Sequence, residues 1–154
     1  MSVDIQPKQT DEQLRQAIVD EAKTWIGTKY HHQAAVKGHG VDCAQILIEV
    51  YHAVGLADKP DVGYYPSDWM LHRSEEIYLG WVEKYCRQIP QEDVNDGDIV
   101  LFKFGRCFSH SGIIAGFPRI IHAQRQDDCC YAEIGQGALE GKQLRFYSFF
   151  GEKK

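Results

Sequence analysis

Cys43 is the residue best suited to covalent chemistry, because it directly follows Asp42 at the head of an apolar, helix-forming stretch. The aligned peptide dipoles of a helix place about half a positive charge at its N-terminus, which favours the thiolate over the thiol. A thiolate can attack a carbonyl carbon near neutral pH. The position of Cys43 therefore predicts a nucleophile, although a cysteine at a helix start is, taken alone, more often a small buried residue.

Hydrolysis of an amide by a cysteine also needs an imidazole that takes up the thiol proton and later protonates the leaving amine, and a polar group that orients this imidazole. His110 and His122 are the candidates for base and orienting residue. Each lies on a predicted strand, and a turn around residues 116–118 joins the two strands. Paired strands lie about 5 Å apart, so we expect the two imidazoles to lie side by side.

Three other polar residues have structural explanations. Asp42 is predicted to be the N-cap of the helix, and a carboxylate engaged in capping cannot also hold an imidazole. His122 lies between two apolar residues, so a histidine buried in the core is the alternative to an orienting role. Three further histidines are expected to be loop residues rather than catalysts: His31, His32 and His39.

The first half of the chain must supply the helix that carries the nucleophile. A pair resembling a capping box, Thr10 with Gln13, precedes apolar residues at helical spacing and predicts a helix over residues 11–26. Residues 27–41 lack periodicity and predict a loop that folds over the site. A second helix is predicted from the Asp42 cap to the stop at Gly55.

After an irregular connection rich in Pro, Gly and Asp, residues 77–85 predict a third amphipathic helix. The pattern then changes to short runs of β-branched and aromatic residues. Helices followed by a meander of strands predict an α+β fold, with N-terminal helices packed on a central antiparallel sheet. The predicted strands are Ile99 to Phe104, His110 to Ala115, Arg119 to Ala123, Tyr131 to Ile134 and Leu144 to Phe149.

Size and composition limit the possible functions. A chain of 154 residues that is 44% hydrophobic suits one domain, expected over residues 11–150 after a flexible N-terminal segment at residues 1–10. A net charge of -5 without a basic stripe excludes nucleic acid as an expected partner. No apolar run approaches the roughly 18 residues that a membrane span needs. With no apolar leader at the start, synthesis in the cytoplasm without a signal peptide is expected.

The five cysteines allow one metal alternative. An odd number without a paired pattern indicates reduced thiols. Cys107 and His110 stand at a spacing that zinc ligands use, with His122 and Cys129–Cys130 further along. The second pair of a zinc knuckle is missing, so neither a metal nor another cofactor is predicted. Two arginines, Arg106 and Arg125, are candidates to bind a substrate carboxylate.

Five ordered motifs together resemble the NlpC-type cysteine peptidases, which are cell-wall hydrolases of bacteria and phages. They are Gly27-Thr28-Lys29-Tyr30, Asp42-Cys43, Gly97-Asp98-Ile99-Val100, His110-Ser111-Gly112-Ile113 and Ile121-His122-Ala123. The stretch from Tyr30 to Cys43 and the segment Tyr65-Pro66-Ser67-Asp68-Trp69 are similar to the phage-associated branch of this superfamily. The resemblance runs from about residue 12 to residue 150.

The resemblance implies a papain-like α+β domain that cleaves the bond from γ-D-glutamate to the diamino acid in peptidoglycan stem peptides. It implies Cys43 as nucleophile, His110 as base and His122 as orienting residue, and it places Tyr30 near the oxyanion site. A phenol O–H or the Cys43 backbone N–H suits that site, where one donor typically contributes about 3 kcal/mol. Plain packing is the alternative for Tyr30.

The chain departs from the family pattern at two places that do not touch the reacting groups. Ala44–Gln45 stands where many members have Ser-Gly, and Ser111 replaces a common valine. These departures leave the predicted catalytic residues unchanged and bear on the substrate pocket and helix packing.

The expected partners are peptidoglycan stem peptides and phage tail proteins, without membrane insertion. The expected place of action is the host cell wall, reached on a virion tail. Two alternatives stay open. One keeps the Cys-His chemistry in an acyltransferase or deamidase. The other is a non-catalytic structural tail component with a zinc-filled or vestigial site.

Overall fold

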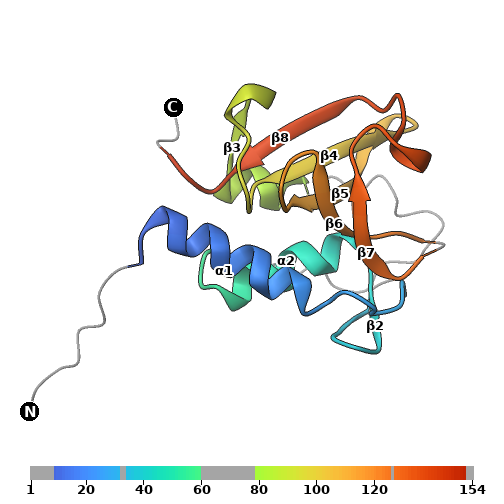
Figure 1. The fold of residues 1–154 in the computed structure, drawn as a ribbon, viewed down its shortest axis with the longest axis horizontal. Helices are drawn as coiled ribbons and strands as arrows, with labels where there is room; N and C mark the ends of the chain where they lie inside the picture. Colours follow the sequence, from blue (N-terminus) through green and yellow to red (C-terminus); the bar gives the residue numbers. More distant parts are fainter. Residues whose placement is uncertain (1–8, 32–33, 60–78, 126, 152–154) are drawn as a thin grey trace, which may run out of the picture.

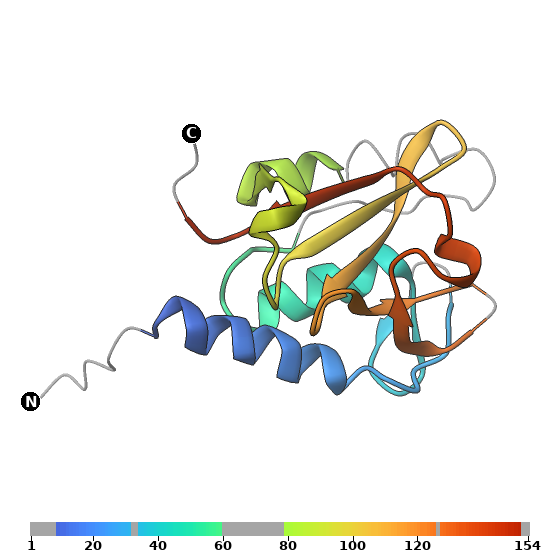
Figure 2. The same ribbon diagram turned by 45° about the horizontal axis from the view of Figure 1, so that its top comes forward.

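The computed structural model of the chain describes residues 9–31, 34–59, 79–125 and 127–151. Two helices, α1 (Asp11–Lys23) and α2 (Cys43–Ala53), pack against one another and on one side of a six-stranded antiparallel sheet (Figures 1 and 2). This is the predicted α+β architecture of helices on an antiparallel sheet. Among the described helices, none has the length and apolar character required to cross a membrane.

The start of α1 is the predicted capping box. The Thr10 hydroxyl accepts from the Gln13 backbone N–H at 3.1 Å, and the Gln13 side chain accepts from the Thr10 N–H at 2.9 Å. The helix ends at Lys23, three residues before the predicted end at 26. The Thr24 hydroxyl donates to Glu21 O at 2.6 Å, and the chain continues in a turn. Local side-chain bonding to the backbone therefore stops the helix before its apolar periodicity ends.

The segment at residues 27–41, predicted to be a loop, contains a small hairpin of β1 (Ala35–Val36) and β2 (Gly40–Val41). The Gly38 N–H donates to the Thr28 hydroxyl at 3.0 Å, which holds the hairpin turn against the preceding chain. Tyr30 forms a parallel bridge with Val41. Backbone pairing therefore fixes the residues that directly precede α2. The prediction of a loop over residues 27–41 does not include this pairing.

The sheet has the strand order β3-β8-β4-β5-β6-β7. Four strands form the predicted meander, whereas β8 returns to lie between β4 and β3. The short strand β3 was not predicted, and β5 and β7 begin earlier than expected. The bounds are β3 (Arg87–Ile89), β4 (Ile99–Phe104), β5 (Cys107–Ile114), β6 (Arg119–Ala123), β7 (Cys129–Glu133) and β8 (Leu144–Ser148).

Three shorter helical pieces complete the described structure. The 3-10 turns are η1 (Gln91–Asp93) and η2 (Gly137–Leu139). Residues 79–85 are helical, in agreement with the C-terminal part of the helix predicted over 77–85. The start of that predicted helix and the segment Tyr65 to Trp69 lie outside the described residues.

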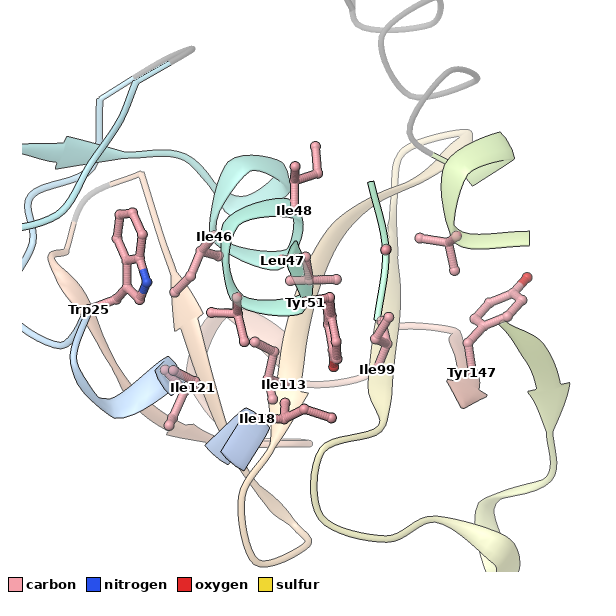
Figure 3. Packing of buried hydrophobic residues seen from close by; sticks show 14 of the residues in the cluster. Ile18, Trp25, Ile46, Leu47, Ile48, Tyr51, Ile99, Ile113, Ile121 and Tyr147 are labelled. Atoms are coloured by element: carbon pink, nitrogen blue, oxygen red, sulfur yellow. The ribbon is translucent and has the colours of Figure 1, made fainter. Parts of the chain in front are cut away.

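The main core lies between the helices and the sheet. Ile46, Leu47 and Tyr51 of α2 pack there with Ile113 and Ile121 of the sheet (Figure 3). The opposite face of the sheet carries a second apolar cluster, made by the residues that alternate with the first set: Val100, Phe102, Ile114, Ile120 and Phe146. Burial on both faces explains why the central strands are apolar almost throughout.

A buried ion pair fastens α1 to the start of β4. Arg15 Nη1 lies 2.8 Å from Asp98 Oδ1, and the Asp98 side chain is fully buried. Asp98 Oδ2 also accepts from the Asn95 backbone N–H at 2.8 Å. The aspartate of the Gly97-Asp98-Ile99-Val100 motif therefore has a structural role, because it joins the first helix to the central sheet.

Candidate functional site

The nucleophile candidate Cys43 is the first residue of α2. Asp42 is the N-cap of this helix, and its Oδ1 accepts from the backbone N–H groups of Ala44 at 3.1 Å and Gln45 at 2.8 Å. These bonds satisfy amides that a helix start leaves without intrahelical partners. The Asp42 carboxylate thus caps the N-terminus of α2, as the sequence predicts.

Two serines of β5 hold Cys43 against the sheet. Its Sγ lies 3.6 Å from the carbonyl oxygen of Ser109, and its backbone carbonyl accepts from the Ser111 hydroxyl at 2.9 Å. These serines flank His110 in the sequence, so Cys43 lies beside the strand segment that carries the candidate base. Cys43 is only half-buried. Cys43 is therefore not fully enclosed in the apolar core.

Sequence reasoning did not identify either serine as part of the site. The one sequence signal at Ser111 is that it replaces a valine common in the family. Ser109 owes its position to a β-bulge, because the pairing of Phe102 with His110 is followed by that of Lys103 with Phe108. This register leaves one extra residue on β5, and bulges of this kind often re-aim backbone groups beside active sites.

His110 and His122 lie side by side, as hairpin pairing predicts. His110 Nε2 and His122 Nδ1 are 2.8 Å apart, and the two rings meet edge to face with centroids 5.0 Å apart. The pairing of Ile113 with Ile121 means that the two histidines meet diagonally across the hairpin. The contact occupies one nitrogen of His110 and leaves its Nδ1 as the ring nitrogen for other partners.

Gly112 stands between the two histidines on this face of the sheet. A Cβ atom built there would lie 2.7 Å from Ile120 Cδ1 and 3.3 Å from Ile120 Cβ. A larger residue would therefore displace Ile120, which is the neighbour of His122 on the same face of β6. The glycine of the His110-Ser111-Gly112-Ile113 motif is explained by this close approach.

Burial keeps both imidazoles neutral at neutral pH. Burial, followed by the charge of His122, lowers the pKa of His110 to about 3. Burial lowers the pKa of His122 to about 4, although the charge of Asp127 acts in the opposite direction. The aromatic rings of Phe102 and Phe104 lie next to His110, with centroids at 5.7 Å and 5.6 Å. Each neutral ring therefore has one nitrogen that carries a proton and one that can accept a hydrogen bond.

Tyr30 lies next to the same site. Its backbone bridge to Val41 places it two residues away from the start of α2 along the paired strand. Burial raises the pKa of Tyr30 above its usual range, the charges of Cys43 and Asp42 add to this effect, and Arg125 opposes it by its charge and by hydrogen bonding. The phenol therefore keeps its proton and can act as a hydrogen-bond donor beside Cys43.

The remaining predicted residues are dispersed. The exposed His31 and His39 lie in and beside the β1–β2 hairpin, and His32 lies outside the described residues. Arg106 is exposed in the turn between β4 and β5, whereas Arg125 is the arginine that contacts Tyr30 electrostatically. Within the described ranges, no group of three or more His, Cys, Asp or Glu side chains is arranged to hold a metal ion. The zinc alternative thus finds no support there.

Comparison with known proteins identifies the chain's relatives. Residues 27–146 match the model of the NlpC/P60 family. The Gamma-DL-glutamyl hydrolase of Bacillus subtilis (strain 168) is 25% identical over 134 residues, which make up 86% of this chain and 29% of that protein. The chain thus spans less than a third of the length of this curated relative.

Solved structures share the fold at low sequence identity. The peptidoglycan hydrolase RipB from Mycobacterium tuberculosis superposes with a TM-score of 0.66 at 13% identity, covering 96% of this chain and 70% of that one. RipD from the same organism, described as a non-catalytic NlpC/p60 domain protein adapted to peptidoglycan binding, gives a TM-score of 0.59 at 10% identity. That alignment covers 90% of this chain and 98% of RipD. The same fold is thus found in a hydrolase and in a protein without catalytic activity.

Proposed function

The chain belongs to the NlpC/P60 family, and from this membership together with the site we propose that it is a cysteine peptidase that hydrolyses amide bonds in the stem peptides of peptidoglycan. The observation that carries the proposal is the position of Cys43. Cys43 contacts Ser109 and Ser111, the two residues that flank His110 in the sequence. His110 in turn shares a hydrogen bond with His122.

In the proposed first half-reaction, the Cys43 thiol gives its proton to Nδ1 of His110, the ring nitrogen that His122 leaves available. The thiolate attacks the carbonyl carbon of the substrate amide, and the C=O electron pair moves to the oxygen. When this intermediate collapses, the C–N bond breaks and the amine leaves with the proton from His110. The acyl part of the substrate stays on Cys43 as a thioester.

In the second half-reaction, water gives a proton to His110 and adds to the thioester carbon. Collapse breaks the C–S bond, releases the carboxylic acid and returns the proton to the Cys43 sulfur. The Tyr30 phenol, which burial keeps protonated, donates to the oxyanion in both halves. A donor aimed at this developing charge typically contributes about 3 kcal/mol to stabilisation of the transition state.

The proposed scissile bond joins γ-D-glutamate to the diamino acid. The name of the Bacillus relative, Gamma-DL-glutamyl hydrolase, supports this choice at 25% identity. We also propose delivery on a phage tail to the host cell wall, on the sequence motifs alone. Much of the sequence that carries this similarity, His32–Gln33 and the segment Tyr65 to Trp69, lies outside the described residues.

The test is digestion of purified sacculi, followed by mass spectrometry of the muropeptides, with Cys43→Ala as the matched inactive variant. The wild-type protein should release fragments with a new free amino group at the diamino acid, and Cys43→Ala should release none. Equal fragment patterns for the two proteins contradict the proposal. Consumption of glutamine analogues without new fragments identifies a deamidase. Sedimentation with sacculi without cleavage identifies a binding protein.

A further inference from the structure

His122 carries a ring nitrogen that no described residue satisfies. Its Nδ1 shares a hydrogen bond with His110, whereas its Nε2 is buried and has no hydrogen-bond partner within the described part of the chain. The side chain is only 1% exposed. A buried polar atom without a partner costs about as much free energy as a lost hydrogen bond. An unpartnered nitrogen inside the site indicates that a partner is needed when the site works.

The proton in the His110–His122 hydrogen bond decides whether His110 can act as a base. When this proton is on His110 Nε2, Nδ1 of His110 is an acceptor, and neutral His122 carries its own proton on Nε2. When the proton is instead on His122 Nδ1, neutral His110 has its proton on Nδ1 and cannot accept another there. The base form of His110 therefore requires an acceptor for the Nε2–H of His122.

Asp127 is the charged residue of the β6–β7 connection that acts electrostatically on His122. His122 pairs with Cys130 across β6 and β7, and Asp127 lies in the connection between the two strands. Its backbone N–H donates to Gln124 O at 3.0 Å, which closes the turn after β6. The charge of Asp127 counteracts the lowering of the His122 pKa and contributes to the raised pKa of Cys130. The Asp127 carboxylate thus acts on both cross-strand partners.

We propose that Asp127 is a positioning residue whose carboxylate accepts the Nε2–H of His122 and so holds His110 in the tautomer that can take the Cys43 proton. An ionised carboxylate offers only acceptors, so it selects this tautomer, whereas a water molecule both donates and accepts and selects neither. Its negative charge also opposes the lowering of the His122 pKa. The inference rests on the proposed function, because it assigns a role within the same site.

Asp128 provides a matched control. It is the next residue, it is exposed like Asp127, and it carries the same charge. Its charge contributes to the raised pKa of Cys129 and Cys130, but it is not among the causes that act on His122. Removal of either carboxylate changes the net charge equally, so a difference between the two variants reports on the His122 contact.

The first measurement is the tautomer of His122, by ¹H–¹⁵N NMR correlation of the imidazole nitrogens in the full-length protein at pH 7. The His122 signals are assigned by their loss in His122→Gln. The wild type and Asp128→Ala should carry the His122 proton on Nε2. In Asp127→Ala the population of this tautomer should fall at least threefold. The same tautomer distribution in Asp127→Ala and the wild type overturns the proposal.

The second measurement is the rate of Cys43 alkylation by iodoacetamide from pH 5 to pH 9, with the modified cysteine located by peptide mass spectrometry. Asp127→Ala should react about tenfold more slowly at pH 7, Asp128→Ala within twofold of the wild type, and Asp127→Glu should recover part of the loss. Equal loss in the two alanine variants indicates a general charge effect and overturns the proposal. Melting curves confirm that the variants remain folded.

Failure of the inference is distinguishable from failure of the proposed function. If wild-type Cys43 reacts no faster than the other four cysteines, the proposed peptidase activity is contradicted, while the tautomer measurement still decides the role of Asp127. If Cys43 is reactive and cleaves sacculi, but Asp127→Ala retains the wild-type tautomer and rate, the inference alone is overturned.

Discussion

The Ser111 hydroxyl donates to the Cys43 backbone carbonyl at 2.9 Å and joins the first residue of α2 to the strand that carries His110. Ser111 is fully buried, so the bond is shielded from water. Cys43 and His110 come from distant parts of the chain, and this contact restrains their relative position. Catalysis depends steeply on such positioning, since small displacements of reacting groups cause large losses in rate.

Ser111→Ala should therefore lower kcat/KM about tenfold and destabilise the protein by about 1 kcal/mol, the typical net contribution of one hydrogen bond. Ser148→Ala is the matched control, because Ser148 is also buried and its hydroxyl accepts from the Phe150 N–H at 3.1 Å in another part of the sheet. Both variants should lose similar stability in urea denaturation, and only Ser111→Ala should lose activity on sacculi. Equal activity of the two variants would show that the contact does not position the nucleophile.

Substitution of the second histidine should have a graded effect. His122→Ala should reduce turnover about 10- to 100-fold, whereas Cys43→Ala and His110→Ala should reduce it to background, because in the proposed mechanism His122 orients the base and does not itself react. His39→Ala, an exposed histidine of the β1–β2 hairpin, is the control and should retain wild-type turnover. Full activity of His122→Ala in muropeptide release would mean that the orienting residue has been assigned wrongly.

Tyr30→Phe should slow turnover about 100-fold without abolishing it, because one oxyanion donor contributes about 3 kcal/mol and the Cys43 backbone N–H remains. The effect should fall on kcat more than on KM, since the charge on the oxygen develops only in the transition state. Tyr131→Phe, an exposed tyrosine on β7, should leave both constants unchanged. A change confined to KM in Tyr30→Phe would indicate substrate packing instead.

Much of this site could be predicted from the sequence, because its main determinants are local. The cap at Asp42 depends on a short side chain next to the first helical amides, and the contact of His110 with His122 depends on one hairpin with a tight turn. Both follow from spacing along a short stretch of chain, which sequence patterns describe well.

The remaining features depend on contacts between distant segments. The position of Ser109 results from the β-bulge between β4 and β5. The apolar periodicity of the sequence does not predict this bulge. Strand β3 has only three residues, and its contacts with β8 come from the far end of the chain. The electrostatic effect of Asp127 on His122 depends on the path of the chain between the paired strands β6 and β7. Register and turn geometry decide these features, and neither is encoded in a local apolar pattern.

Stability should fall in mild acid because of the two buried imidazoles. Their pKa values in the folded protein are about 3 and about 4, below the value of about 6.5 of an unfolded histidine. Below pH 6.5 the unfolded chain therefore binds more protons than the folded protein, and the free energy of unfolding decreases as the pH falls. Above pH 6.5 both states hold neutral imidazoles, so this contribution to stability is fully present.

Between pH 6 and pH 4, each imidazole should lower the free energy of unfolding by up to about 1.4 kcal/mol per pH unit. The His122→Gln variant lacks one of the two imidazoles, so its free energy of unfolding should decrease less steeply than that of the wild type between pH 6 and pH 4. Urea denaturation at pH 8 and pH 5 measures the difference, with the pH 8 values correcting for the packing cost of the substitution. Because the carboxylates are the same in both proteins, parallel pH profiles would show that the pKa of His122 is the same in the folded and the unfolded protein, which contradicts its burial as a neutral ring.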